Sequence, residues 1–292
     1  MRNQHVPTGS DVFLDHVGAF VQDRDAAAAT LSRLGFTQTP FAQHMNRQAD
    51  GAAAPSGTGN RCVMFREGYL EILSATGEDT ALARQFNAGL ARYEGLHLIA
   101  FGVADVEACR ENLIRQGLAP LPSVHLRRPV PTETGTSEGR FDVVRFPPET
   151  MPEGRIQVAA HQTPETVWQD RWLDHANGAE ALSGILVVVE DVAETSKRFN
   201  ALSMSDGTPR LVRGLVGVTI EDDAAQLIPN IVCPCLPFMA AVGVRCADLD
   251  QTEGYLKSQA VAYQRHAARL YIAPNDTLGM TVVFHGPETA PW

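Results

Sequence analysis

A strand followed at once by a helix occurs four times along the chain, and this internal repeat constrains the fold more than any other feature. The four strand–helix pairs occupy residues 13–34, 95–116, 184–201 and 237–258, and in each an aspartate stands near the start of the helix. Aspartate is a favoured N-cap residue because its side chain accepts hydrogen bonds from the first free backbone N–H groups. The repeat therefore predicts four copies of one structural unit.

Apolar stretches of strand length follow each predicted helix, so the unit consists of a strand, a helix and about three further strands (βαβββ). Four such modules predict an α+β fold. We place a first domain at residues 1–162, a linker at 163–182 and a second domain at 183–292. Two stretches rich in small residues and proline, residues 46–60 and 129–139, predict long loops.

The composition limits which partners the protein can bind and indicates the cellular compartment in which it works. The chain has 292 residues, and 34 Asp+Glu against 24 Lys+Arg give a net charge of −10, which disfavours binding to nucleic acid. The longest apolar stretches, such as residues 185–189, are too short to span a membrane, and the first ten residues lack a secretory signal. Five cysteines without a CxxC pair indicate reduced thiols. We therefore expect a cytoplasmic protein.

Polar residues occur at inward positions of otherwise apolar strands in the first two modules. His16 and His97 stand at equivalent places in the repeat, each followed by two other residues and then Ala-Phe, and Glu71 interrupts the apolar last strand of the first module. A buried carboxylate is costly without a partner, and two imidazoles with a carboxylate suit a divalent first-row metal. Gly184 and Met239 stand where the histidines would fall in the second half, which we therefore expect to bind no metal.

Three motifs identify a family resemblance. Asp-His-Val at residues 15–17 opens the first module, Gly-Tyr-Leu-Glu-Ile-Leu at 68–73 ends it, and Gly-Thr-Gly-Asn-Arg at 57–61 precedes that last strand. The chain resembles the vicinal oxygen chelate superfamily, which includes glyoxalases, bleomycin-resistance proteins and dioxygenases, and more narrowly its glyoxalase-like domain branch. The resemblance covers residues 12 to about 180, and beyond that point only the repeat pattern supports it.

The resemblance implies that the four modules pair into two cupped, incomplete β-barrel domains, the first of them built around one divalent metal ion (Fe, Mn, Ni, Zn or Co). It assigns His16, Glu71 and His97 as metal ligands and places Gln157 at a fourth position, where the family often has glutamate. A glutamine carbonyl is a weaker ligand and a poor proton acceptor. His161 lies on the same strand face and is a candidate ligand, base or substrate contact. We take Gln157 and His161 as the catalytic candidates, with Gln157 beside the metal and His161 toward the rim.

Other polar side chains are candidates for substrate contacts. Asn60 and Arg61 end the glycine-rich stretch, and His44 and His125 fall on predicted strands of the cup. Three arginines are further candidates for holding an anionic substrate, namely Arg127, Arg128 and Arg140.

These observations predict a metal-dependent glyoxalase-like enzyme, a lyase or isomerase acting on a small oxygenated molecule that chelates the metal through adjacent oxygens. One alternative is an extradiol-type Fe(II) dioxygenase acting on a catechol, since His, His and Glu formally make a facial triad. Another is a ligand-binding or resistance protein without turnover. The expected partner is a small-molecule substrate, a homodimer is left open, and neither nucleic acid nor membrane is expected.

Overall fold

The computed structural model describes residues 5–47, 53–202 and 211–292. The first module begins with a strand and helix and ends with three strands, as the repeat predicts. Its elements are β1 (Phe13–Phe20), α1 (Arg24–Arg33), β2 (Ala42–Arg47), β3 (Ala53–Met64) and β4 (Tyr69–Ala75).

The second module repeats this order after an additional helix, α2 (Ala81–Leu90). Its elements are β5 (Gly95–Gly102), α3 (Val106–Arg115), β6 (Val124–Thr132), β7 (Gly135–Arg145) and β8 (Arg155–His161).

Two short helices, α4 (Pro164–Val167) and η1 (Asp170–Trp172), lead into the second half. There β9 begins inside the stretch expected as a linker, and the predicted boundary itself stays a prediction. The elements are β9 (Ala179–Val188), α5 (Val192–Ala201), β10 (Leu215–Thr219), α6 (Glu221–Leu227), β11 (Phe238–Cys246), α7 (Leu249–Ser258), β12 (Gln264–His266), β13 (Arg269–Ile272), η2 (Pro274–Asp276) and β14 (Thr281–His285).

The helix that follows the first strand of each module begins as the sequence predicts. Asp23, Asp105, Asp191 and Asp248 are the N-caps of α1, α3, α5 and α7, and each carboxylate accepts from backbone N–H groups of the first turn. Each such cap stabilises its helix by about 1 kcal/mol. The four caps fix where each first strand ends and its helix begins.

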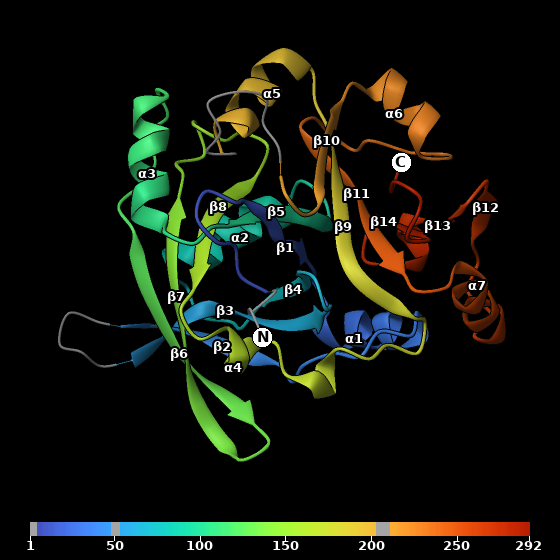
Figure 1. The fold of residues 1–292 in the computed structure, drawn as a ribbon, viewed down its shortest axis with the longest axis horizontal. Helices are drawn as coiled ribbons and strands as arrows, with labels where there is room; N and C mark the ends of the chain where they lie inside the picture. The colour runs from blue at the N-terminus through green and yellow to red at the C-terminus, as the bar shows by residue number, and fades with distance from the viewer. Residues whose placement is uncertain (1–4, 48–52, 203–210) are drawn as a thin grey trace.

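The strands form two cups, which are joined where β5, an interior strand of the first, pairs with β11, an interior strand of the second (Figure 1). In the first half the strand order is β2-β3-β4-β1-β5-β8-β7-β6, with β1 antiparallel to β5 at the centre. In the second half it is β10-β9-β11-β14-β13-β12, and β11 contacts β5 through the pair Met239–Leu96. The predicted α+β fold of paired βαβββ modules is confirmed. The third module is shorter, because its described residues contribute β9 and β10 alone.

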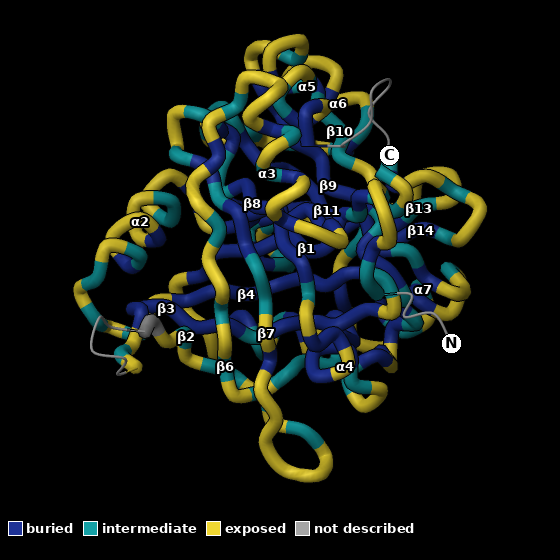
Figure 2. Tube along the Cα trace, turned by 60° about the vertical axis from the view of Figure 1, so that its left-hand side comes forward, coloured by how far each residue is buried: buried dark blue, intermediate teal, exposed yellow. Residues whose placement is uncertain are grey.

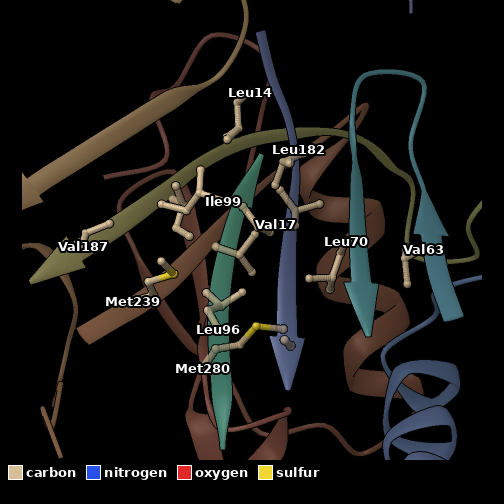
Figure 3. Packing of buried hydrophobic residues seen from close by; sticks show 14 of the residues in the cluster. Leu14, Val17, Val63, Leu70, Leu96, Ile99, Leu182, Val187, Met239 and Met280 are labelled. Atoms are coloured by element: carbon tan, nitrogen blue, oxygen red, sulfur yellow. The ribbon is translucent and has the colours of Figure 1, made fainter. Parts of the chain in front are cut away.

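One hydrophobic core runs through both halves. Val17 and Leu70 of the first half and Leu182 and Val187 of the second belong to the same buried cluster (Figure 3). The helices α1, α3, α5 and α7 contribute to it, so they cover one face of the strands and leave the opposite face free to line the cups. None of the described helices is long and apolar enough to cross a membrane.

The two stretches expected as long loops are largely β-structure. Residues 53–60 belong to β3, and residues 129–139 lie almost entirely in the β6–β7 hairpin, whose tip projects into solvent (Figure 2). The prediction was wrong for the second stretch because β6 is an edge strand, where Pro129 and Pro131 are tolerated. Residues 48–52 of the first stretch lie outside the described residues.

The second cup is filled by protein. A Cβ atom on Gly184 would lie 2.7 Å from the Trp292 ring, and one on Gly243 would lie 2.5 Å from Pro291. Trp292 also packs against a buried cluster that includes Leu186 of β9. Since α5 and α7 cover the other face, Pro291 and Trp292 occupy the concave side of this cup.

Candidate functional site

The first cup is open and contains a cavity of about 150 Å³, a volume that admits a small organic molecule. Its floor is made by inward-facing residues of neighbouring strands. His16 of β1 lies opposite Ala100 of β5, and Ala100 lies beside Gln157 of β8. Glu71 of β4 and Asn60 of β3 continue this lining on the other side of β1.

A carboxylate that alternation would place on the opposite face contacts two of the histidines that line the cavity. The register between β1 and β5 shifts from Leu14 to His16, so Asp15 is an extra residue in β1. Its Oδ2 lies 2.6 Å from His16 Nδ1 and 3.1 Å from His161 Nε2. Burial would raise the pKa of Asp15, but its contacts with the two imidazoles hold it well below the ordinary value. Asp15 is therefore an anion that accepts a hydrogen bond from each histidine.

This bridge fixes the tautomer of both rings. When His16 donates through Nδ1, its Nε2 carries a lone pair. When His161 donates through Nε2, its neutral ring carries the lone pair on Nδ1, a buried atom without a hydrogen-bond partner among the described residues. Two imidazole lone pairs are thus oriented by one carboxylate.

Glu71 is the only carboxylate that lines the cavity along the described part of the chain. Its Oε2 lies 4.0 Å from His16 Nε2, its Oε1 accepts from Asn60 Nδ2 at 2.5 Å, and His44 Nε2 is 3.9 Å from the same Oε1. Burial would raise the pKa of Glu71, but the neighbouring imidazoles and the Arg155 guanidinium hold it below the ordinary value. Glu71 is therefore ionised at neutral pH.

Gln157 completes the group around His16. Its amide Nε2 is 3.2 Å from His16 Nε2, while its Oε1 is buried and has no hydrogen-bond partner among the described residues. Rotating the amide exchanges the two atoms and would turn the unpaired oxygen toward the imidazole. No three His, Cys, Asp or Glu side chains in the described residues are grouped closely enough for a metal ion. The donors fit a divalent ion when Gln157 is counted with His16 and Glu71.

His97 does not join this cluster, so the expected convergence of His16, Glu71 and His97 is not found. The register passes from Gly18–Leu98 to Ala19–Leu96, which leaves His97 as an extra residue in β5. Its Nε2 is 2.8 Å from the Tyr93 carbonyl oxygen, and its ring stacks on Tyr93 and Phe20. The bulge and the aromatic contacts hold His97 at the other end of the strand as a packed residue, and Leu98 and Ala100 take the inward positions of β5.

The remaining candidates divide between the cavity and the surface. His44 and Asn60 line the cavity, as do Arg127 and Arg128. The His161 ring lines it too, but is buried against Trp168 rather than at the rim, and this part of the prediction was wrong. Three others do not line it: Arg61, Arg140 and His125, the last of which is exposed and paired with Asp142 at 2.6 Å.

The sequence analysis did not single out Asp15, which contacts His16 from behind, or the lining residues Tyr69, Arg145 and Arg155. The Tyr69 ring stacks on His16 with centroids 4.3 Å apart. A carboxylate directly beside a strand histidine was the available signal for Asp15. Arg145 and Arg155 were visible as charges in apolar strands, the same signal that identified Glu71.

The second cup has lost these donors. Strand register gives the second-half residue at each first-half position. Gly184 stands at the position of His16, Gly217 at that of Glu71, Gly243 at that of Ala100 and Val283 at that of Gln157. That this half binds no metal stays a prediction, which these four residues support.

The pKa shifts of two histidines predict a pH-dependent stability. Burial lowers the pKa of His44 and of His97 to about 4, from an ordinary value of 6.5. Between these limits the unfolded chain binds more protons than the folded one, so the free energy of unfolding should fall as the pH drops from about 6.5 to 4. Urea unfolding at pH 7 and pH 5 measures this. His97→Phe should flatten the dependence, whereas His125→Gln, at an exposed position, should not; equal slopes in all three proteins would contradict it.

The cupped βαβββ modules with a polar cluster on the first-cup floor define a protein of the vicinal oxygen chelate superfamily. The model of one family, described as a glyoxalase-like domain, matches residues 14–203. The chain belongs to this glyoxalase-like domain family, and the resemblance seen in its motifs is confirmed.

Solved structures share the fold at low sequence identity. A hypothetical protein from Staphylococcus aureus is 11% identical with a TM-score of 0.61, covering 94% of this chain and 99% of that one. A mutant of 4-hydroxymandelate synthase from Streptomyces coelicolor is 14% identical with a TM-score of 0.57, covering 96% and 94%. A xylose isomerase-like TIM barrel/4-hydroxyphenylpyruvate dioxygenase fusion protein is 13% identical with a TM-score of 0.54, covering 96% and 50%. A search of curated proteins gave no match.

Proposed function

We propose that this protein is a lyase or isomerase that moves a proton on a small oxygenated organic molecule bound in the first cup. The observation that carries the proposal is the Asp15 carboxylate, which bridges His16 and His161 at the floor of an open cavity. A buried acid–base pair beside a space of substrate size is a typical arrangement for proton transfer.

A divalent metal ion is part of the proposal. His16 through Nε2, Glu71 through its carboxylate and Gln157 through its amide oxygen would hold it, and the unpaired Gln157 oxygen supports this set. When bound, the ion would supply positive charge that stabilises negative charge on adjacent substrate oxygens. Asp15 would act behind His16, because a carboxylate on the far imidazole nitrogen orients a metal-binding histidine and raises its basicity.

His161 is the residue that we assign to the proton. Its Nδ1 would accept a proton from the substrate carbon beside the chelated oxygens. The resulting imidazolium would be stabilised by the hydrogen bond from its Nε2–H to Asp15. The ring is enclosed by Trp168, Phe141 and Tyr69, which keep bulk water from the proton during transfer. The same nitrogen would return the proton to an adjacent atom on the same face of the substrate.

Metal analysis and isotope exchange test this function together. Elemental analysis of the purified protein should find about one divalent ion per chain, and the loaded protein should exchange C–H hydrogens of some 2-oxo or 2-hydroxy acids for deuterium in D₂O, followed by NMR. His161→Gln should lose exchange but keep the metal, and His125→Gln should keep both.

Two results would replace the proposal. Oxygen uptake with a catechol, measured in an oxygen electrode, would indicate a dioxygenase. The fusion protein that shares this fold is named as a dioxygenase. Ligand binding with neither exchange nor oxygen uptake across the panel would indicate a binding protein.

A further inference from the structure

The charge of the cavity wall differs from that of the whole chain. The chain carries a net charge of −10, yet the cavity is lined by Arg127, Arg128, Arg145 and Arg155 against the single carboxylate of Glu71. The local positive charge of this cavity favours the binding of small anions, although the protein as a whole is acidic.

Two of these arginines lie deep in the cup and close to the catalytic candidates. Arg145 of β7 is the direct cross-strand partner of Gln157 in β8, and Arg155 stands two residues before Gln157 on the same strand face. Cross-strand partners have Cβ atoms about 5 Å apart, and residues two apart on one strand are about 7 Å apart, so both arginines are neighbours of Gln157, which contacts His16.

The two guanidinium groups are partly buried and have no ion-pair partner among the described residues. Neither forms an ion pair within 4.0 Å of another described residue, and Arg145 Nε is buried without a hydrogen-bond partner in the described chain. Burial and mutual repulsion lower the pKa of Arg145 to about 10, and burial lowers the pKa of Arg155, while Glu71 opposes both shifts. Both groups stay charged at neutral pH and bear a desolvation cost that Glu71 offsets in part.

We infer that Arg145 and Arg155 form an oxyanion subsite, so that the substrate carries a carboxylate or phosphate group beside the oxygens presented to His16 and Glu71. Guanidinium groups bind planar or tetrahedral oxyanions through paired N–H donors, and an anion here supplies the missing counter-charge. Arg127 differs, because it is exposed and already paired with Glu138 at 3.3 Å. The inference rests on the proposed function for the position of the reacting oxygens.

Isothermal titration of the full-length protein with inorganic phosphate and with malonate tests the subsite. At least one of the two should bind, and the tighter one shows whether a tetrahedral or a planar anion is preferred. Arg145→Met and Arg155→Met should each weaken binding about 10- to 100-fold, as expected for a charged hydrogen-bonding group. Arg145→Lys should weaken it less, because it keeps the charge and loses the paired donors.

The control is Arg84→Met, which removes an exposed arginine of α2 that is paired with Asp79, just before that helix. Unchanged binding in this variant and weaker binding in the two cavity variants supports the subsite. No binding of either anion to the wild-type protein, or equal weakening in all three variants, overturns it. Metal content separates this result from the proposed function. The Arg145 and Arg155 variants should retain the metal. A wild-type protein that binds the anion but contains no metal would support the oxyanion subsite and contradict the metal assignment.

Discussion

Glu71→Gln is expected to reduce bound metal to less than one tenth of the wild-type content and turnover by more than about 100-fold. The substitution keeps the shape of the side chain and removes its negative charge. Glu71 is the only carboxylate facing His16 Nε2 from within the cavity of the described chain, so a cation would be left with an imidazole and two amides. Elemental analysis after gel filtration measures the metal, and circular dichroism checks the fold.

Glu78→Gln is the matched control, because Glu78 also accepts hydrogen bonds from neighbouring side chains but lies outside the cavity. This variant should keep both metal and activity. Full metal occupancy in Glu71→Gln would show that the ion is held by other residues.

Asp15→Asn is expected to lower turnover by roughly 10²–10⁴-fold, because an amide carries no negative charge to stabilise an imidazolium and donates instead of accepting wherever its Nδ2 faces a ring. One ring of the pair would then adopt the other tautomer, and either His16 Nε2 or His161 Nδ1 would lose its lone pair. Metal affinity should fall less, by about 10- to 100-fold, since Asp15 acts through His16.

The tautomer states distinguish this role from simple packing. Nitrogen chemical shifts of the two imidazoles should change in Asp15→Asn, and the rate–pH profile should move with them. Asp142→Asn makes the same change in a His–Asp pair outside the cavity, where Asp142 lies 2.6 Å from the exposed His125, and should leave turnover unchanged. Unaltered imidazole shifts in Asp15→Asn would contradict the positioning role.

The repeat and the helix caps could be predicted from the sequence because both depend on local chemistry. Asp23 and its three counterparts cap helices through hydrogen bonds that span three residues, and the apolar alternation of β1 and β5 follows from burial. His16 and Glu71 were also singled out, since a polar side chain in an apolar strand is conspicuous at any register, and the family resemblance placed Gln157 beside them.

The errors at Asp15 and His97 have one cause, the two bulges between β1 and β5. Strict alternation places Asp15 on the face opposite His16, and repeat equivalence places His97 beside the metal, but each residue is the extra one at a shift in register. A bulge depends on the pairing of strands distant in sequence, so no local pattern indicates it. Arg145 and Arg155 were missed for a related reason: their proximity to Gln157 arises from the β7–β8 pairing.

The filled second cup limits which substitutions the chain can accept. Gly184 and Gly217 stand at the positions of His16 and Glu71, and a Cβ on either would lie 2.7 Å from Trp292 atoms. A histidine or glutamate could return there only after the indole had moved away, and losing the indole first would open a void in a packed cluster. Each single step thus lowers stability before the pair of steps restores a ligand. This mutual dependence makes the division between an open and a closed cup hard to reverse by point mutation.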